Sequence, residues 1–540
     1  MRWKLGAALI LAAATALPQQ TAPAPPLPTF SERVEVRVLD LDVDVTDSKG
    51  QPVRDLKREN FTVKVGDKAV PIDYFARVDD GTIHAPDLAT ASPDQVLAAY
   101  KKGDEAFVPR NFLIFVDLGF LGPGLRKRSL EALRDLVTRL GPNDAVRIVL
   151  FDRLPRVLTD WTTSKETTID ALSSIEKQRV GMSRLISQRQ ALSLIDSSPR
   201  RRGSRLQLAR QYAEETGAEI ETMLAAMKQE LLTLTPLSGK KAFLFVSGGF
   251  EYQPGFVLSQ YALGGPSLSL VNIRDVSRHL ESLVRDANSN EVTFYTVDAN
   301  GLTGEGATAS NDDPLASRPS VGFQARQDRQ TGMIEMARDT GGIALLNTND
   351  FQRGLSRIYQ DVSTYYSIGV TLSKLGSASY LGVRVEVDRP GVVVRARRGF
   401  QPRKEADVVT DRARATMESE LSYRAIPVRL QTAAPTPGKL YTLPITVTLP
   451  ASALTFVADG DKAKAQAEIY IGSVDDKGRT SDVARQETSF QLPSDQASSE
   501  TPLRYDAQLQ TRKGNYRIVV NVRDVATGKM GTARANVRVE

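Results

Sequence analysis

The chain has 540 residues, a length that predicts two to four domains because one apolar core rarely serves so many residues. Its 70 basic and 64 acidic residues give a net charge of +6, too mild a balance to indicate a nucleic-acid partner. There is no cysteine, which excludes disulfide bonds, thiolate metal sites, cysteine nucleophiles and a lipid-modified cysteine anchor.

The N-terminus has the pattern of a secretory signal peptide. Two basic residues precede an apolar run at 5–14, and Ala14-Thr15-Ala16 supplies a small-residue cleavage signal. The run is too short to span a bilayer, and the Pro-rich sequence after it disfavours a buried core helix. We therefore expect a signal peptide at 1–16, a linker at 17–31, and a mature chain without a transmembrane segment. Its location would be the periplasm or the cell exterior.

Residues 32–80 have the period-two alternation of half-buried strands and predict an N-terminal β module. The alternating acidic residues Asp40, Asp42 and Asp44 resemble the spacing of a calcium loop. In a strand, however, their carboxylates share one face, which we expect to point to solvent. The glycine and closing glutamate of an EF-hand loop are also missing, so we do not expect calcium here.

From residue 108 to 402 the pattern changes to strands alternating with amphipathic helices, which predicts a doubly wound α/β domain with a mostly parallel sheet. The expected strands are 112–116, 146–151, 242–246 and 292–297. The expected helices are 130–140, 166–177, 205–234, 270–287, 329–339 and 350–364.

The stretch 178–235 is longer than a crossover between strands needs, so we interpret it as a helical insertion in the α/β domain. It contains the densest basic cluster, Arg200-Arg201-Arg202 with Arg205. A solvated loop or helix start explains this cluster better than a docking site for an acidic partner. Because an insertion decorates a scaffold that does not need it, 178–235 is also the best candidate for partner recognition.

After Ser367 the sequence returns to strand patterns, and a charged segment at 403–421 separates them from a final module at 422–540. That module has regularly spaced strand and turn signals and predicts a β-sandwich. The expected strands are 443–449, 467–471, 505–509 and 516–522.

An ordered set of motifs resembles the von Willebrand factor A domain, and more closely the VWFA-related domain proteins abundant in acidobacteria. The resemblance implies a Rossmann-like central sheet and a role in protein interaction or adhesion. The residues that carry it are 43–53, Phe61, Asp117, 296–302, 337–342, the Tyr365-Tyr366 pair and 395–400.

The family's metal-ion-dependent adhesion site does not carry over in full. Its first loop is Asp-x-Ser-x-Ser, and here Asp117 is followed by Gly119 and Leu121 at the serine positions. In the third loop Gly248 stands where the family has an aspartate. Three ligand oxygens are therefore lost from a site that would bind Mg²⁺, so we expect a degenerate, metal-free site. Loose candidates for the second-loop threonine are Thr159, Thr162 and Ser183.

Asp117 is thus the one residue that clearly matches a metal ligand of the family's site, and we expect it not to bind a metal ion. The structural interpretation is that its carboxylate caps a helix or accepts hydrogen bonds from loop amides. Asp152 and Asp298, also at strand ends, keep open an alternative Mg²⁺ site rearranged around Asp117.

The sequence offers no coherent catalytic constellation. The two histidines, His84 and His279, belong to no zinc or nucleophile motif, and Ser174-Ile175-Glu176-Lys177 has no companion motif. No phosphate-binding loop or dinucleotide fingerprint is present. We therefore expect no enzyme, no catalytic residue and no cofactor, with an uncharacterised carboxylate hydrolase as a remaining alternative.

These observations together predict an exported interaction, adhesion or scaffold protein of the cell envelope or exterior, with a protein partner and no nucleic acid. Mg²⁺-dependent adhesion around Asp117 is the second hypothesis, and a hydrolase is the third. Carboxylates gathered around Asp117 would favour the second, and paired, perturbed carboxylates in a polar cleft would favour the third.

Overall fold

The chain folds into two compact units that meet in sequence near residue 404, and each is described by itself. The computed structural model describes residues 37–84, 108–178, 181–198, 202–235, 237, 239–265, 275–302, 315, 319–372, 380–401, 405–418, 422–459 and 462–540. The expected signal peptide and linker lie outside the described residues.

The first unit is built on a mixed sheet of six strands in the order β11-β10-β9-β6-β7-β8, all parallel except β8. Every residue of β6, β9 and β10 is buried, as expected of strands covered on both faces. The four predicted strands are confirmed, and the antiparallel edge strand β8 was not expected. The bounds are β6 Arg110–Asp117, β7 Ala145–Asp152, β8 Leu154–Thr162, β9 Lys240–Ser247, β10 Val292–Asp298 and β11 Ala344–Leu345.

Helices cover both faces of this sheet, which confirms a mixed α/β architecture. On one face α2 (Pro123–Thr138), α3 (Lys165–Glu176) and α9 (Phe351–Ser363) bury their leucine and isoleucine stripes. The other face is covered by α7 (Ser277–Ser289), α8 (Pro319–Thr340) and part of α5. None of the helices in the described part of the chain is long and apolar enough to cross a membrane.

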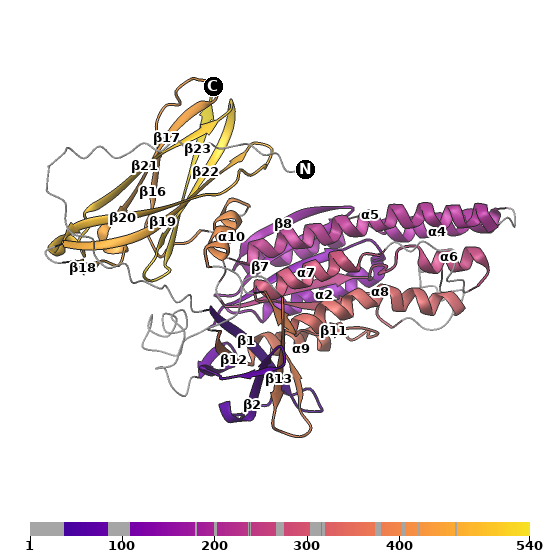
Figure 1. Ribbon diagram of the computed structural model, residues 1–540. Helices are drawn as coiled ribbons and strands as arrows, with labels where there is room; N and C mark the ends of the chain where they lie inside the picture. Colours follow the sequence, from indigo (N-terminus) through magenta and orange to yellow (C-terminus); the bar gives the residue numbers. More distant parts are fainter. Residues whose placement is uncertain are drawn as a thin grey trace. The chain divides into compact units, whose positions relative to one another are not determined.

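The segment expected as an insertion forms α4 (Ser183–Ser197) and α5 (Arg202–Leu234), which lie side by side (Figure 1). The C-terminal half of α5, from Ile220 to Leu234, is part of the core on the sheet. The other half packs with α4 and α6 (Phe256–Leu263) around a separate apolar cluster. Only α4 and the first half of α5 are therefore additional to the sheet's cover. We call these two elements the helical arm.

The N-terminal strands do not form a module of their own. They pair with strands that follow α9, because β1 lies between β12 and β14 while β2 pairs with β13. The sequence pattern places those later strands in the α/β domain at 108–402, whereas they complete the N-terminal sheets. The bounds are β1 Arg37–Thr46, β2 Phe61–Val65, β3 Lys68–Val70, β4 Tyr74–Asp79, β5 Thr82–His84, β12 Tyr365–Leu372, β13 Leu381–Val387, β14 Val393–Arg395 and β15 Gly399–Phe400, with a short 3-10 helix at Arg58–Asn60.

Tyr366 shows why the pairing is specific. Its ring stacks on Phe75 with centroids 5.5 Å apart and packs on Phe61 at 5.0 Å. Its hydroxyl donates to the carbonyl of Val53 at 2.9 Å and accepts from the amide of Leu56 at 3.1 Å. One tyrosine from β12 thus organises the core and an adjoining loop of the N-terminal sheets.

The acidic face of β1 is only partly exposed, and the expectation that it points to solvent is wrong for Asp44. Asp44 is buried, and burial, reinforced by Asp361, raises its pKa well above the ordinary value. Asp42 forms an ion pair with the buried Lys240 of β9, at 3.0 Å. The tertiary fold places the α/β domain against this strand, which alternation in the sequence does not reveal.

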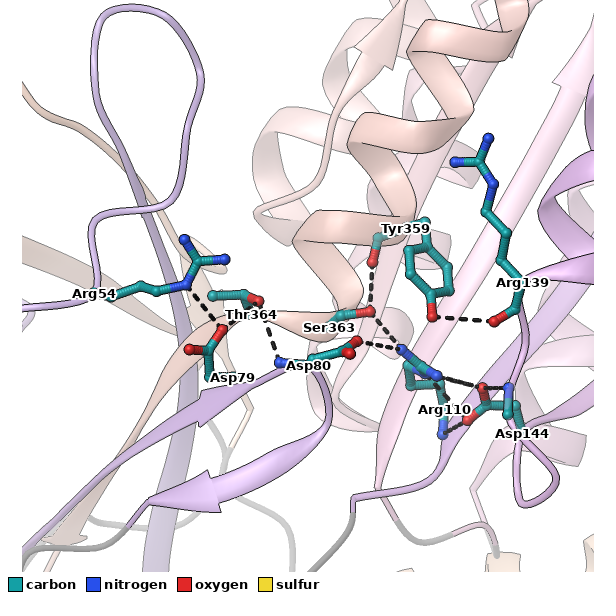
Figure 2. A network of polar contacts seen from close by, with 10 residues as sticks. Arg54, Asp79, Asp80, Arg110, Arg139, Asp144, Tyr359, Ser363 and Thr364 are labelled. Atoms are coloured by element: carbon teal, nitrogen blue, oxygen red, sulfur yellow. Dashed lines mark hydrogen bonds and ion pairs between the residues drawn. The ribbon is translucent and has the colours of Figure 1, made fainter.

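A buried arginine joins the N-terminal sheets to the start of β6 (Figure 2). Arg110 forms an ion pair with Asp144 at 2.7 Å, donates to the hydroxyl of Ser363 at 2.6 Å and lies 3.7 Å from Asp80. Its guanidinium also lies over the ring of Tyr359, 4.8 Å from the centroid. Nearby Arg54 pairs with Asp79, but at the surface.

The second unit consists of α10 (Glu405–Glu418) and two antiparallel sheets that share one apolar core. The charged segment expected as a separator includes α10. Met417 of this helix packs directly on Gly472, where a Cβ would lie 2.4 Å from the methionine sulfur. The strands are β16 Arg429–Thr432, β17 Tyr441–Pro450, β18 Val457–Asp459, β19 Lys462–Asp475, β20 Ala484–Pro493, β21 Pro502–Thr511, β22 Gly514–Asp524 and β23 Met530–Val539, with 3-10 helices at Ala451–Ala453 and Ser494–Gln496.

Replacing Arg110 by methionine is expected to lower the free energy of unfolding by about 3–5 kcal/mol, because Asp144 would be left as a buried carboxylate without its cation. Trp161 of β8 is the only tryptophan after residue 16, so its fluorescence during urea unfolding measures this unit alone. The matched control is Arg54→Met at the surface pair, which should lose at most about 1 kcal/mol. Equal losses in the two variants would contradict the role given to Arg110.

Candidate functional site

The carboxyl ends of the parallel strands form the edge of the sheet at which α/β proteins commonly bind ligands. β6 ends in Asp117, β9 in Ser247 and β10 in Asp298. These strands are neighbours in the sheet, and Asp298 pairs in register with Ser247. The sheet therefore brings two of the predicted acidic residues to one edge.

Asp117 is fully buried, and its carboxylate oxygens are engaged by the protein. Its Oδ1 accepts from the guanidinium of Arg184 and from the amide of Gly119 at 3.0 Å. Its Oδ2 accepts from the hydroxyl of Ser247 at 2.6 Å. The contact with the Gly119 amide matches the structural interpretation, in which Asp117 binds loop amides. The ion pair with Arg184 was not expected.

The residues at this edge do not fit the family's Mg²⁺ site. Gly119 and Leu121 carry no ligand oxygen, and neither does Gly248. An aspartate has no room at 248, since a Cβ there would lie 2.7 Å from the carbonyl oxygen of Phe120. Among the described residues no group of three acidic or histidine side chains could hold a metal ion.

The loose candidates for a second-loop ligand are used elsewhere. The hydroxyl of Thr159 donates to the carbonyl of Asp160 at 3.1 Å, and that of Thr162 accepts from the amide of Ser164 at 3.1 Å. The hydroxyl of Ser183 donates to Glu219 at 2.7 Å. None of these contacts brings an oxygen to the carboxylate of Asp117.

Asp298 is held by its own neighbours. Its Oδ2 accepts from Gln330 at 2.6 Å and its Oδ1 from the amide of Asn300 at 3.0 Å. Burial raises its pKa above the ordinary value despite these donors. Asp152 lies half-buried at the end of β7. Both oxygens of Asp298 are thus already bound by protein donors, which leaves a poor ligand for Mg²⁺.

Two further buried acidic residues, Glu251 and Asp328, lie close together and are not among the residues predicted from the sequence. Glu251 accepts from the hydroxyl of Tyr212 at 2.6 Å, from the side chain of Gln188 at 3.1 Å and from the amide of Gly255 at 2.7 Å. Burial raises the pKa of Glu251 in spite of these donors. The one signal in the sequence is that Glu251 closely follows the end of a buried strand.

Asp328 of α8 is the partner of Glu251 in this pair. Its Oδ1 accepts from the amide of Gln253 at 3.1 Å. Burial, together with the charge of Glu251, raises its pKa to about 7. Perturbed acidic pairs mark functional sites and structural networks alike. Here both oxygens of Glu251 are bound by protein groups, which indicates a structural network.

The residues weighed for catalysis are not brought together. His84 is exposed on β5 and His279 is exposed on α7. The hydroxyl of Ser174 donates to the carbonyl of Ala171 within α3 at 2.7 Å, as a helical serine commonly does. Neither histidine is placed to activate this serine, so these residues form no nucleophile and base pair.

No family model matches the chain, and no curated protein matches it. Solved structures similar to it include von Willebrand factor A proteins. A von Willebrand factor type A protein from Catenulispora acidiphila is 9% identical, with 89% of this chain and 73% of that one covered at a TM-score of 0.23. BatB from Bacteroides thetaiotaomicron is 12% identical, with 47% and 97% covered at 0.23. Manganese-loaded TRAP protein from Plasmodium vivax is 8% identical, with 54% and 94% covered at 0.24.

The family named by the sequence motifs is thus present among the structural neighbours. At identities of 8–12% and TM-scores below 0.25, these neighbours carry no argument about the site. The chemistry at this edge of the sheet therefore depends on the residues of this chain alone.

The raised pKa of Asp328 predicts a pH-dependent stability. The folded protein keeps a proton on Asp328 up to about pH 7, whereas the unfolded chain releases it near pH 4. The stabilisation is therefore complete below pH 4 and is lost as the pH rises to 7 and above. Asp328→Asn removes this dependence, because asparagine does not titrate. The free energy of unfolding of the variant minus that of the unmodified chain should therefore increase by about 2–4 kcal/mol from pH 4 to pH 8.

Urea unfolding at a series of pH values, followed by the fluorescence of Trp161, measures the difference. Asp170→Asn on the exposed face of α3 is the control and should show no such trend. A difference between Asp328→Asn and the unmodified chain that stays constant from pH 4 to pH 8 would refute the assignment.

Proposed function

We propose that this chain is an exported, non-enzymatic protein that binds a protein partner through its von Willebrand factor A-like domain without a metal ion. The observation that carries the proposal is the state of Asp117. Its negative charge is balanced by Arg184, and its oxygens accept from Arg184, Gly119 and Ser247. A divalent cation would have to displace a buried cation of the protein itself.

Mg²⁺-dependent adhesion at a rearranged site is less well supported. Such a site needs several oxygen ligands and an open position for a carboxylate of the partner. Both oxygens of Asp298 are bound by Gln330 and Asn300, and burial raises its pKa above the ordinary value. The hydrolase hypothesis is weakened in the same way, because the oxygens of Glu251 are bound by Tyr212, Gln188 and Gly255.

The helical arm is the part of the domain to which we assign partner recognition. The sheet and its two apolar layers are complete without α4 and the first half of α5. Apart from Arg184 in the first turn of α4, the core does not require the arm, and its outer surface is free to serve as a binding surface. The assignment agrees with the sequence-based hypothesis for 178–235, now narrowed to the arm.

Export is proposed from the N-terminal sequence alone. Two basic residues, a short apolar run and Ala14-Thr15-Ala16 form the three parts of a signal peptide. The chain would then act in the periplasm or outside the cell. The absence of cysteine is compatible with an oxidising compartment.

The metal-free proposal predicts that the chain from residue 17 onward does not respond to Mg²⁺, Mn²⁺ or Ca²⁺. Thermal unfolding and isothermal titration with each ion, against a chelator, measure the response. The melting temperature should stay within about 1 °C, since a ligand stabilises only to the extent that it binds the folded state. Asp117→Ala is the control. A saturable stabilisation that Asp117→Ala abolishes would make metal-dependent adhesion the better account.

The export proposal predicts that residues 1–31, fused to an alkaline phosphatase that is active only outside the cytoplasm, give active enzyme. Leu11→Arg places a charge in the apolar run and should reduce the activity at least about tenfold. Leu27→Arg in the linker is the matched control and should leave the activity unchanged. Equal activity from all three fusions would show that the segment is not a signal peptide.

A further inference from the structure

Arg184 reaches Asp117 through an unusual backbone. Gly181 and Met182, directly before α4, have φ values of 123° and 64°, and the second is a conformation that residues with a side chain seldom adopt. The amide of Met182 donates to the carbonyl of Leu118 at 2.7 Å, and that of Leu185 donates to the carbonyl of Gly119 at 3.1 Å. The start of α4 is therefore bound directly to the loop that follows Asp117.

The guanidinium of Arg184 lies in a closed environment. Its side chain is 1% exposed and that of Asp117 is 0% exposed. Besides Asp117 it faces Glu219, whose Oε1 is 3.3 Å from Nε, and the ring of Phe120, 5.5 Å away. Burial opposes the charge of Arg184, but Asp117 and Glu219 outweigh burial and raise its pKa above the ordinary value.

Gly119 is the residue that makes this arrangement possible. A Cβ at 119 would lie 2.0 Å from Nε and 2.1 Å from Nη2 of Arg184. The family's metal site has a serine at the position of Gly119. That serine would collide with the side chain of Arg184 as it lies here. The absence of the serine and the presence of Arg184 are therefore linked, because the guanidinium occupies the space that a side chain at 119 would need.

We propose that the guanidinium of Arg184 is a built-in replacement for the metal ion at the carboxyl edge of the sheet. It supplies the positive charge that Asp117 requires, and it attaches the helical arm to that edge. Unlike Mg²⁺, it leaves no coordination position for a carboxylate of a partner, because its side chain is only 1% exposed and is enclosed by Glu219, Phe120 and Met223. This inference rests on the proposed metal-free function and names the residue responsible for it.

The test uses the chain from residue 17 with four sequences at positions 119 and 184: unmodified, Gly119→Ser, Arg184→Ala, and both together. Each single change should lower the melting temperature by roughly 5–10 °C, one by collision with Arg184 and the other by leaving Asp117 buried without a cation. The double variant should be no less stable than Arg184→Ala alone, because the collision is gone. Additive losses would overturn the proposal.

Mn²⁺ and Mg²⁺ supply the second readout, in each case against a chelator. Removing Arg184 frees Oδ1 of Asp117, while Oδ2 stays beside the hydroxyl of Ser247. The hydroxyl introduced by Gly119→Ser adds a further oxygen. The double variant should therefore show a saturable rise in melting temperature of at least about 3 °C with millimolar Mn²⁺, lost again when Asp117→Asn is added. If Mn²⁺ does not raise the melting temperature of the double variant, the proposal that Arg184 replaces a metal ion is wrong. A response of the unmodified chain would overturn the proposed metal-free function instead.

Two further variants keep the test decisive where Arg184→Ala does not fold. Asp117→Asn combined with Arg184→Met removes both charges and should fold, with a melting temperature above that of Arg184→Met alone. Arg189→Met, on the exposed side of the same helix, should change the melting temperature by less than about 2 °C. If the neutralised pair is no more stable than Arg184→Met, the charge of Arg184 does not serve Asp117.

Discussion

The buried ion pair between Asp117 and Arg184 is the constraint on which the carboxyl edge of the sheet depends. Neither charge could remain in the interior alone, because the desolvation of an unpaired ion costs several kcal/mol. Together they fix the end of β6, the start of α4 and the identity of residue 119. The left-handed backbone of Met182 is tolerated because the same contacts hold it in place.

Strand β6 carries a buried arginine and aspartate pair at each end. Arg110 at its start pairs with Asp144, and Asp117 at its end pairs with Arg184. The first pair lies where the N-terminal sheets meet the α/β core, and the second lies where the helical arm begins. The apolar interior of the strand supplies packing energy, whereas the two charged ends specify which elements attach there.

A strand-end aspartate at the carboxyl edge of an α/β sheet can therefore be held entirely by groups of the protein. In this chain the oxygens of Asp117 serve Arg184, Ser247 and an amide. The network of Glu251, Tyr212 and Asp328 behind the edge extends the same pattern of buried acids held by protein donors. In the proposed function, the carboxyl edge of the sheet holds the start of the helical arm in place.

The sequence by itself determined the central architecture, because hydrophobic periodicity is a local property. The apolar runs of β6, β7, β9 and β10 and the stripes of α2 and α9 are visible without knowledge of their neighbours. The motifs around Asp117 also sufficed to show that the ligand oxygens are missing at Gly119, Leu121 and Gly248. These conclusions depend on residue identity and spacing alone.

Only the tertiary structure decided what takes the place of those oxygens. Arg184 is 67 residues from Asp117 in the chain and lies in a polar segment that resembled a surface insertion. Likewise, the pairing of β1 with β12 and the burial of Asp44 involve partners some three hundred residues away. Charge pairing and strand pairing between distant segments leave no periodic signal in either segment, so a single sequence cannot reveal them.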